Sequence, residues 1–386
     1  MKKNLIILVL VAAVVSLFWL YVAERGYKQS EKQQQRNSLL ENGTQQSAQQ
    51  IYQWRMVTSW PKNFPGLGVG PEVFAKIVNE MSNGRLQVKV FAGGELVPPL
   101  GVFDAVSNGS VELGHSGPYY WKGKIPASPF FSAIPFGMTG QEMNAWLHQG
   151  GGMELWREAY APFNLLPLAG GNSGVQMGGW FRKEINSVAD LKGLKMRIPG
   201  LGGEVLQRLG GVSVTMPGGE LYTALQTGVL DAAEWVGPYN DLATGLYEVT
   251  KYYYYPGWHE PGSTLELIVN KTAFEKLPPD LKKIIEIAAR YVNANMLDEY
   301  TASNNAALKT LIDDHNVQLK RFPDEVLREL NKTSDQVIAE LVASDPMAKK
   351  VYASWKSFAD DVKAYHKVSE QAFLEARDLQ AAETAQ

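Results

Sequence analysis

A ten-residue pattern occurs twice in the chain, and it limits the possible folds more than any other feature of the sequence. The first copy begins at Phe103 and the second at Tyr222, 119 positions later. Both copies place an aromatic residue, an alanine, an aliphatic residue, a glycine, a second aliphatic residue and an acid at matching positions. A short helix that ends at glycine and leads directly into a strand fits this order. The pattern therefore predicts two similarly built lobes.

Another pattern predicts a parallel sheet. A β-prone run over residues 54–60 is followed by apolar residues at helical spacing over residues 73–81 and by an alternating strand over residues 86–91. Strand, helix and strand within about forty residues form a βαβ unit with parallel strands. Helical segments are expected from Pro278 to about residue 313 and again over residues 323–343 and 346–380. We predict an α/β fold with long C-terminal helices.

Composition excludes several function classes. A net charge of -3 argues against a nucleic-acid partner, which requires a clustered basic surface. The chain has no cysteine, so disulfides, thiol nucleophiles and thiolate metal sites are excluded. The histidines do not show the spacing of a zinc motif, and no P-loop or serine-nucleophile motif is present.

The N-terminus predicts a location outside the cytoplasm. Lys2 and Lys3 precede an uncharged run over residues 5–23, which would be about 28 Å long as a helix. We interpret residues 1–23 as an uncleaved membrane anchor, with an atypical cleaved signal as the alternative. The polar, Gln-rich residues 24–50 are interpreted as a flexible linker.

Ligands of parallel sheets bind beyond the carboxyl ends of the strands, and a charged residue stands at such an end here. Arg197 lies in an otherwise apolar run just before Pro199 and a Gly-rich loop. A guanidinium binds a carboxylate through two parallel hydrogen bonds, so we predict that Arg197 holds an anionic ligand. The alternative is an arginine on an edge strand that faces water.

Two further strand ends supply polar groups. The strands that follow the repeated pattern end at His115, shortly before Tyr119 and Tyr120, and at Glu234. Glu234 is either a functional acid or half of a structural salt bridge. His115 is either a pocket residue or a core histidine, and the same two interpretations apply to His259.

Oxygen-donor groups near these ends predict a cation site. A candidate strand ends near residues 175–177, so Gln176 and Glu234 both offer side-chain oxygens at strand ends, and the backbone near Trp235 offers a carbonyl. Such a set suits Na⁺ or Ca²⁺ and is poor for zinc or copper, which prefer His or Cys. The cation would bridge the bound anion to the protein.

Residues 188–199 (VADLKGLKMRIP) and 222–235 (YTALQTGVLDAAEW) resemble the DctP-type solute receptors of tripartite ATP-independent periplasmic (TRAP) transporters. The resemblance extends from about Trp54 to about residue 310. It implies two α/β lobes joined by crossing strands and a long helix, with the ligand in the cleft between the lobes. It also implies that Arg197 clamps the carboxylate of the substrate.

The ending Glu234-Trp235, with Gln176 upstream, is similar to the branch that binds 2-oxo or 2-hydroxy monocarboxylates together with a cation. The resemblance implies that Gln176, Glu234 and the Trp235 carbonyl hold the metal, which we expect to be Na⁺ or alternatively Ca²⁺. Tyr119, Tyr120 and His259 complete the substrate site that we predict. That branch is similar to dimers that exchange a C-terminal helix, so the last helix is expected to pack either on its own lobes or on a second copy of the chain in a homodimer.

From these observations we place lobe I at residues 51–168 together with about 258–310, and lobe II at residues 169–257. Residues 311–386 are expected to form C-terminal helices, with a possible role in dimerisation. The predicted function is a periplasmic receptor, not an enzyme, that delivers a monocarboxylate such as pyruvate or lactate to a TRAP transporter. The alternatives are a membrane-tethered ligand sensor and a metal-assisted hydrolase or lyase that uses Glu234 with His115 or His259.

Overall fold

The computed structural model describes residues 15–33 and 50–384, and the chain divides after Ile51 into two units. In the first unit, residues 15–33 form a helix. Residues 24–33, which were expected to belong to a flexible linker, are therefore helical. The remaining parts of the predicted anchor and linker, residues 1–14 and 34–49, lie outside the described residues. Among the residues described, no helix combines the length and the apolar character needed to span a membrane.

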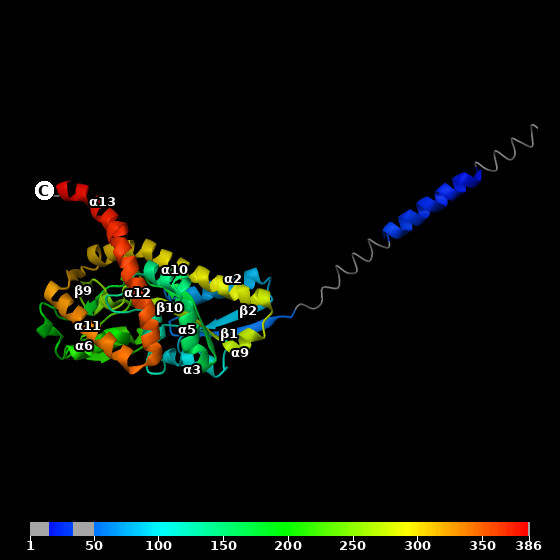
Figure 1. The fold of residues 1–386 in the computed structure, drawn as a ribbon. Coiled ribbons are helices and arrows are strands. Elements are labelled where there is room, and N and C mark those ends of the chain that lie inside the picture. Colours follow the sequence, from blue (N-terminus) through cyan, green and yellow to red (C-terminus); the bar gives the residue numbers. More distant parts are fainter. Residues whose placement is uncertain (1–14, 34–49, 385–386) are drawn as a thin grey trace, which may run out of the picture. The chain divides into compact units, whose positions relative to one another are not determined.

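The second unit, Tyr52–Gln386, is built around two sheets (Figure 1). The first sheet has the strand order β2-β1-β3-β10-β4. Its strands are β1 (Tyr52–Thr58), β2 (Leu86–Phe91), β3 (Leu113–Ser116), β4 (Leu165–Asn172) and β10 (Thr264–Asn270). Strand β1 is parallel to β2 and β3, whereas β10 is antiparallel to β3 and β4. Helix α2 (Val69–Met81) connects β1 to β2, so the predicted βαβ unit is confirmed.

The second sheet has the order β11-β9-β5-β8-β6-β7. Its strands are β5 (Gly179–Phe181), β6 (Lys195–Arg197), β7 (Val212–Val214), β8 (Ala232–Ala233), β9 (Tyr252–Tyr255) and β11 (Gln318–Arg321). Within residues 311–386, where C-terminal helices were expected, residues 318–321 form β11 instead, which pairs in parallel with β9. This strand is short and mostly exposed, so it has no buried apolar face that a sequence pattern would reveal.

Both copies of the repeated pattern adopt the predicted structure. Helix α3 (Val102–Ser107) precedes β3 in the first sheet, and helix α7 (Leu221–Gln226) precedes β8 in the second. Gly109 and Gly228, which follow these helices, have φ angles of 77° and 76°. Glycine adopts this left-handed conformation without the strain that a Cβ atom would cause.

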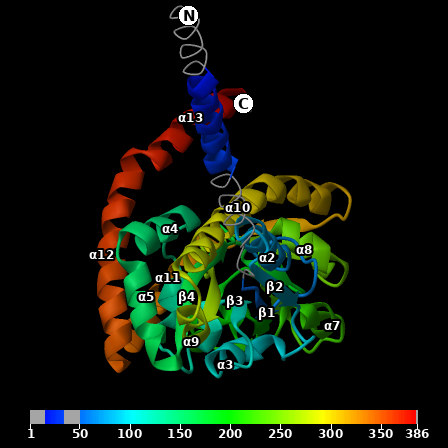
Figure 2. The same cartoon turned by 90° about the vertical axis from the view of Figure 1, so that its right-hand side faces the viewer.

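Long helices cover the first sheet. Helix α10 packs on β4 and α2, and helix α12 lies against α4 and α5 (Figure 2). Helix α10 presents apolar residues to the interior at helical spacing, including Leu281, Ile285 and Val292. Besides α2, α3 and α7, the bounds of the α-helices in the second unit are α4 (Gly140–Gln149), α5 (Gly152–Tyr160), α6 (Gly200–Arg208), α8 (Pro238–Thr244), α9 (Lys271–Glu275), α10 (Pro279–Asp313), α11 (Asp324–Ser344), α12 (Pro346–Val368) and α13 (Glu370–Thr384).

The chain passes between the two sheets in the middle of the unit. It leaves the first sheet after β4, through residues 173–178, and returns after β9, through residues 256–263. We call these two stretches the crossing segments. The lobe boundaries expected from the sequence stay a prediction, but each crossing segment lies close to one of them.

Candidate functional site

Arg197 and Glu234 are brought together by neighbouring strands of the second sheet. Arg197 is the last residue of β6, and Glu234 directly follows β8. The two strands are parallel, and Arg197 pairs with Ala233 in their register. Their carboxyl ends therefore meet at one edge of the sheet, as the sequence predicted. Both side chains are buried, with 1% of Arg197 and none of Glu234 exposed.

The guanidinium of Arg197 is almost fully engaged by the protein. Its Nη1 pairs with the carboxylate of Glu234 and donates to the carbonyl of Glu234 over 3.2 Å. Its Nε donates to the Met216 carbonyl over 3.2 Å, and its Nη2 donates to the Tyr120 hydroxyl over 3.0 Å. Burial alone would lower the pKa of Arg197, but the Glu234 carboxylate raises it. The alternative of a water-facing edge arginine is wrong, and the salt bridge considered for Glu234 is present.

Trp235 covers this ion pair. Its ring centroid lies 5.1 Å from the guanidinium carbon of Arg197, which is within the range of a cation–π interaction. The ring packs on Gly218, where a Cβ atom would overlap the indole. The indole is therefore held in place, and the Trp235 backbone follows the Glu234 carboxylate directly in the chain.

Gln176 and Glu260 meet where the two crossing segments touch. Gln176 Nε2 donates to Glu260 Oε2 over 2.9 Å and to the Ser173 hydroxyl over 3.1 Å. The backbone N–H of Gln176 also donates to the Glu260 carbonyl over 3.2 Å. The interpretation of residues 175–177 as the end of a strand is wrong, because β4 ends at Asn172 and Gln176 lies in a crossing segment.

His259 connects the crossing segments to the strand ends. Its Nε2 lies 3.2 Å from Glu234 Oε2. Glu234, His259 and Glu260 each offer a ligand atom, and these atoms lie within 4.8 Å of one another. Burial, followed by the charge of Glu234, raises the pKa of the Glu260 carboxyl. A cation between the two carboxylates would relieve both effects.

The donor set fits such a cation. The Gln176 amide oxygen is buried and has no hydrogen-bond partner within the described part of the chain, although a buried acceptor normally has one. Gln176, Glu234 and Glu260 all present oxygen atoms, which are the ligands that Na⁺ and Ca²⁺ take. Glu260 was missed in the sequence. An acid directly after His259, in a Pro/Gly-containing stretch between two strands, was the signal that marked it.

Tyr119 and Tyr120 reach the site from the first sheet. They belong to a 3-10 helix, Pro118–Trp121, that directly follows β3. The Tyr120 hydroxyl accepts from Arg197, and the ring of Tyr119 lies 4.7 Å from that of Tyr120 between centroids. Both tyrosines line a cavity of about 260 Å³ together with Pro199 and Gly200. The predicted site residues are thus gathered from both sheets.

His115 does not lie with these predicted site residues. Its Nδ1 accepts a 2.7 Å hydrogen bond from the Trp60 indole, and its Nε2 lies 2.9 Å from the Gly170 carbonyl. Burial lowers the pKa of His115 to about 4. Both ring nitrogens are therefore satisfied by the protein, and His115 is a core histidine.

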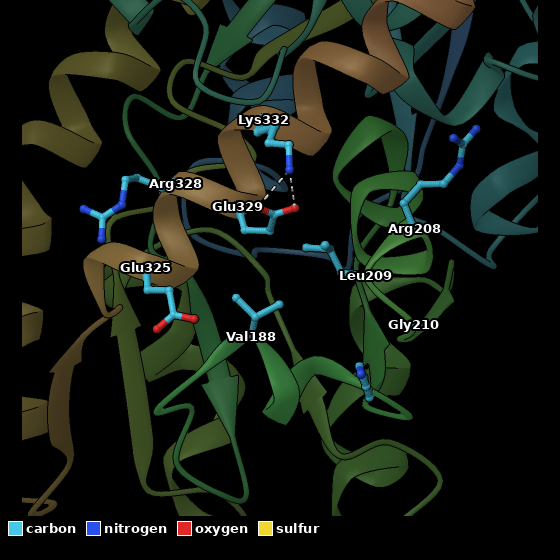
Figure 3. Close-up of a pocket in the computed structure, with 9 residues that line it drawn as sticks. Val188, Arg208, Leu209, Gly210, Glu325, Arg328, Glu329 and Lys332 are labelled. Carbon is cyan, nitrogen blue, oxygen red and sulfur yellow. Dashed lines mark hydrogen bonds and ion pairs between the residues drawn. The ribbon is translucent and has the colours of Figure 1, made fainter.

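A larger pocket, of about 900 Å³, lies between the end of α6 and helix α11 (Figure 3). Charged side chains line it, but several are already paired with other protein groups. Lys332 pairs with Glu329, and Arg208 pairs with Glu340. None of the residues that the sequence predicted for the site lines this pocket.

Two sheets joined by crossing segments, with a buried arginine and a cluster of oxygen donors where they meet, define a two-lobed solute-binding protein. Residues 56–345 match the family model of DctP, the bacterial extracellular solute-binding proteins of family 7. The chain belongs to this family, and the fold predicted from the sequence is confirmed.

Individual relatives share most of the chain. A monocarboxylate 2-oxoacid-binding periplasmic protein from Nostoc sp. is 47% identical over 83% of this chain and 87% of its own. A TRAP periplasmic solute-binding protein from Pseudoalteromonas atlantica, with bound sodium and pyruvate, is 45% identical with a TM-score of 0.82, over 84% of this chain and 99% of its own. A protein from Bordetella bronchiseptica, a mixed-occupancy dimer with calcium and picolinate, is 41% identical with a TM-score of 0.84, over 87% of this chain and 100% of its own.

Proposed function

We propose that this protein is a periplasmic receptor that binds a 2-oxo or 2-hydroxy monocarboxylate, such as pyruvate or lactate, with a metal cation and delivers it to a TRAP transporter. The observation that carries the proposal is the buried amide oxygen of Gln176, which has no hydrogen-bond partner among the described residues. The amide nitrogen of the same side chain donates to Glu260, which shares a cluster with Glu234. The sodium and pyruvate bound by the Pseudoalteromonas protein support the same assignment.

Each site residue has a role in this proposal. Arg197 holds the carboxylate of the acid, because one N–H of its Nη2 makes no hydrogen bond to the described residues and its bond to Glu234 can be exchanged. Gln176, Glu234, Glu260 and the Trp235 carbonyl hold the cation, which we assign as Na⁺ with Ca²⁺ as the alternative. A bound cation supplies positive charge to the oxygens of the acid. Tyr119, Tyr120 and His259 enclose the acid from the remaining sides.

Burial of the site implies that binding is coupled to opening of the cleft. Gln176, Arg197, Glu234, His259 and Glu260 are all at most 5% exposed. A ligand therefore enters only when the lobes separate. Because the site takes residues from both sheets and both crossing segments, a bound acid favours the closed arrangement over the open one.

The proposal is tested by isothermal titration calorimetry of pyruvate into Glu234→Gln protein. We expect affinity for the cation and for the acid to fall together, because the two ligands stabilise each other's binding. Glu266→Gln is the matched control, since Glu266 is equally buried but lies outside the site. Full affinity for pyruvate in chelator-treated wild-type protein without added Na⁺ would contradict the role of the cation.

Receptor and enzyme are separated by the fate of the acid. A receptor returns pyruvate unchanged after prolonged incubation, whereas a hydrolase or lyase consumes or converts it. Mass spectrometry of the acid after release measures this. Uptake of labelled pyruvate by cells with and without the gene then separates a transport receptor from a sensor.

We propose that a second copy of the chain covers the exposed apolar residues at the end of the C-terminal helices. Tyr365, Val368, Phe373 and Leu379 are 65–77% exposed on α12 and α13, where large apolar side chains normally require cover. The Bordetella relative is described as a dimer. Deletion of residues 370–386 should therefore convert a dimer into a monomer in sedimentation experiments. A full-length protein that is monomeric at high concentration would contradict this proposal.

The N-terminal segment is proposed to hold the receptor at the outer face of the inner membrane. Two lysines followed by an uncharged run over residues 5–23 support this assignment. N-terminal sequencing of the protein recovered from the membrane and periplasmic fractions tests it. A soluble mature protein that begins near residue 24 or later would show that the segment is a cleaved signal.

A further inference from the structure

A small polar cavity lies outside the site described above. Its volume is about 140 Å³, and it is formed by helices α4, α5 and α10 together with strand β4. The arrangement of these elements can be followed in Figure 2. None of the proposed ligand-binding residues lines it. The residues that line it are His148, Met153, Arg157, Leu168, Ala169, Glu286, Ala289 and Arg290.

The polar groups of this cavity are incompletely satisfied. His148 Nε2 is buried and has no hydrogen-bond partner within the described part of the chain. Nearby acids are already committed, because Glu286 pairs with Lys283 and Glu158 pairs with Lys350. Among the described residues, Arg157 and Arg290 form neither an ion pair nor a side-chain hydrogen bond. The cavity is thus lined by two arginines, one imidazole and one acid, Glu286, which already pairs with Lys283.

The charges of the two arginines act on His148 together. Burial, together with the charges of Arg290 and Arg157, lowers the pKa of His148 to about 4. The two guanidiniums come from different helices, α10 and α5, and the imidazole comes from α4. A neutral imidazole still has one N–H to donate, so the cavity offers three donor groups and a surplus of positive charge.

We propose that this cavity binds one small oxyanion of carboxylate or phosphate size. Arg157 and Arg290 would each donate charge-assisted hydrogen bonds to its oxygens, and His148 would donate from Nε2. The volume equals that of roughly five water molecules, which is enough for such an ion. Because β4 leads directly into the crossing segment that carries Gln176, an ion here would brace the start of that segment.

The test is titration of the full-length protein with inorganic phosphate and, separately, with acetate. We expect saturable binding of one ion per chain, weakened about a hundredfold in the Arg157→Gln/Arg290→Gln variant because two charged hydrogen-bond donors are lost. Arg208→Gln, a similarly exposed arginine on another face, should bind as the wild type does. Saturable binding of phosphate, of acetate or of both tells the two sources of the oxyanion apart, whereas saturable binding of neither overturns the proposal.

Two further measurements distinguish this site from the proposed carboxylate site. In an Arg197→Lys background, phosphate binding should persist, whereas its loss would place the anion in the cleft and overturn the proposal. In labelled-histidine NMR spectra, phosphate should raise the pKa of His148, because the ion offsets the charges of Arg157 and Arg290. The charge of Glu286 is already balanced by Lys283. An unchanged His148 signal, or equal binding by wild type and double variant, would also overturn it.

Discussion

Each sheet of the second unit buries a glutamate, but the two glutamates have opposite surroundings. Glu266, on β10 of the first sheet, accepts hydrogen bonds from the Trp121 indole and from the Tyr160 hydroxyl, the latter over 2.8 Å. Both donors are neutral. Glu234, at the carboxyl end of β8 in the second sheet, pairs instead with Arg197 and lies 3.2 Å from His259. Both carboxyl groups are fully buried.

The difference shows how a ligand site can be told from a structural polar cluster. Around Glu266 the neutral donors occupy both carboxylate oxygens, and burial raises the pKa of this carboxyl to about 7. Around Glu234 the charges are paired, yet the neighbouring Gln176 oxygen and His259 Nδ1 have no partner within the described residues. Buried groups are normally satisfied, so paired charges beside unsatisfied groups indicate that a ligand completes the cluster.

The repeated pattern makes the same contrast at equivalent positions. His115, within β3, and Glu234, directly after β8, occupy corresponding positions of the two repeated units. His115 is saturated by Trp60 and Gly170, whereas Glu234 faces the incomplete cluster. The two lobes therefore share a backbone design, but of the two strand ends only the one at Glu234 carries a charged side chain beside unsatisfied groups.

The largest effect is expected from Arg197→Lys. Lysine keeps the charge but replaces a planar fork by a point charge, so it cannot make two parallel hydrogen bonds to a carboxylate. We expect pyruvate affinity to fall about a thousandfold, or about 4 kcal/mol, from the loss of two charged hydrogen bonds. Calorimetry of variant and wild type measures this. Unchanged affinity would show that Arg197 does not bind the acid. The surroundings of Glu234 would then no longer distinguish a ligand site from the structural cluster around Glu266.

The second prediction concerns Glu266→Gln and pH. The folded-state pKa of Glu266 is raised to about 7, so the folded protein holds this proton more tightly than the unfolded chain does. Its contribution to stability is complete below the unfolded-state pKa and is lost as pH rises towards 7. Over this window wild type should lose about 3 kcal/mol relative to the variant, because each pKa unit corresponds to about 1.4 kcal/mol.

Urea unfolding at pH 4.5, 6 and 8 measures this difference. Glutamine at position 266 can still accept from Trp121 and donate to Tyr160, so the variant should fold. Glu275→Gln, on the exposed surface of α9, is the control and should leave the pH profile of stability unchanged. Parallel profiles for wild type and Glu266→Gln would mean that the pKa of Glu266 is not raised in the folded protein.

A smaller effect is expected from His115→Leu. The substitution leaves the Trp60 indole N–H without its acceptor, and it removes the neighbour of the Gly170 carbonyl. A buried donor or acceptor that loses its partner costs about 1–3 kcal/mol, so we expect a loss of about 2 kcal/mol in unfolding free energy. Affinity for pyruvate should stay within about twofold. A large loss of affinity without a loss of stability would place His115 in the site.

Much of the fold was predictable because it repeats local patterns. The βαβ unit, the two glycine-ended helices and the long helix α10 all follow from spacing that is visible within short windows. Arg197 was predictable for the same reason, since a charge in an apolar strand before a Gly-rich loop is a local anomaly.

The remainder of the site depends on contacts between distant residues. Gln176 and Glu260 are 84 positions apart, and their contact exists only because the two crossing segments lie side by side. No local period marks a crossing segment, so Gln176 was placed at a strand end and Glu260 was missed. Strand β11 was not predicted, because its partner β9 is distant in the sequence and because β11 buries little of its own surface.

The smallest predicted effect tests the equivalence of the two lobes themselves. Gly109→Ala and Gly228→Ala each place a Cβ atom on a residue with a positive φ angle, which costs about 1 kcal/mol. At Gly109 the new atom would lie 3.6 Å from the Asn270 amide, an ordinary contact. At Gly228 it would lie 3.1 Å from the end of the flexible Arg182 side chain, which can move. We therefore expect nearly equal losses of unfolding free energy, measured by urea denaturation, with Gly228→Ala slightly the larger. Losses that differ by more than about 1 kcal/mol would show that the two helix ends are not equivalent, although their sequences match.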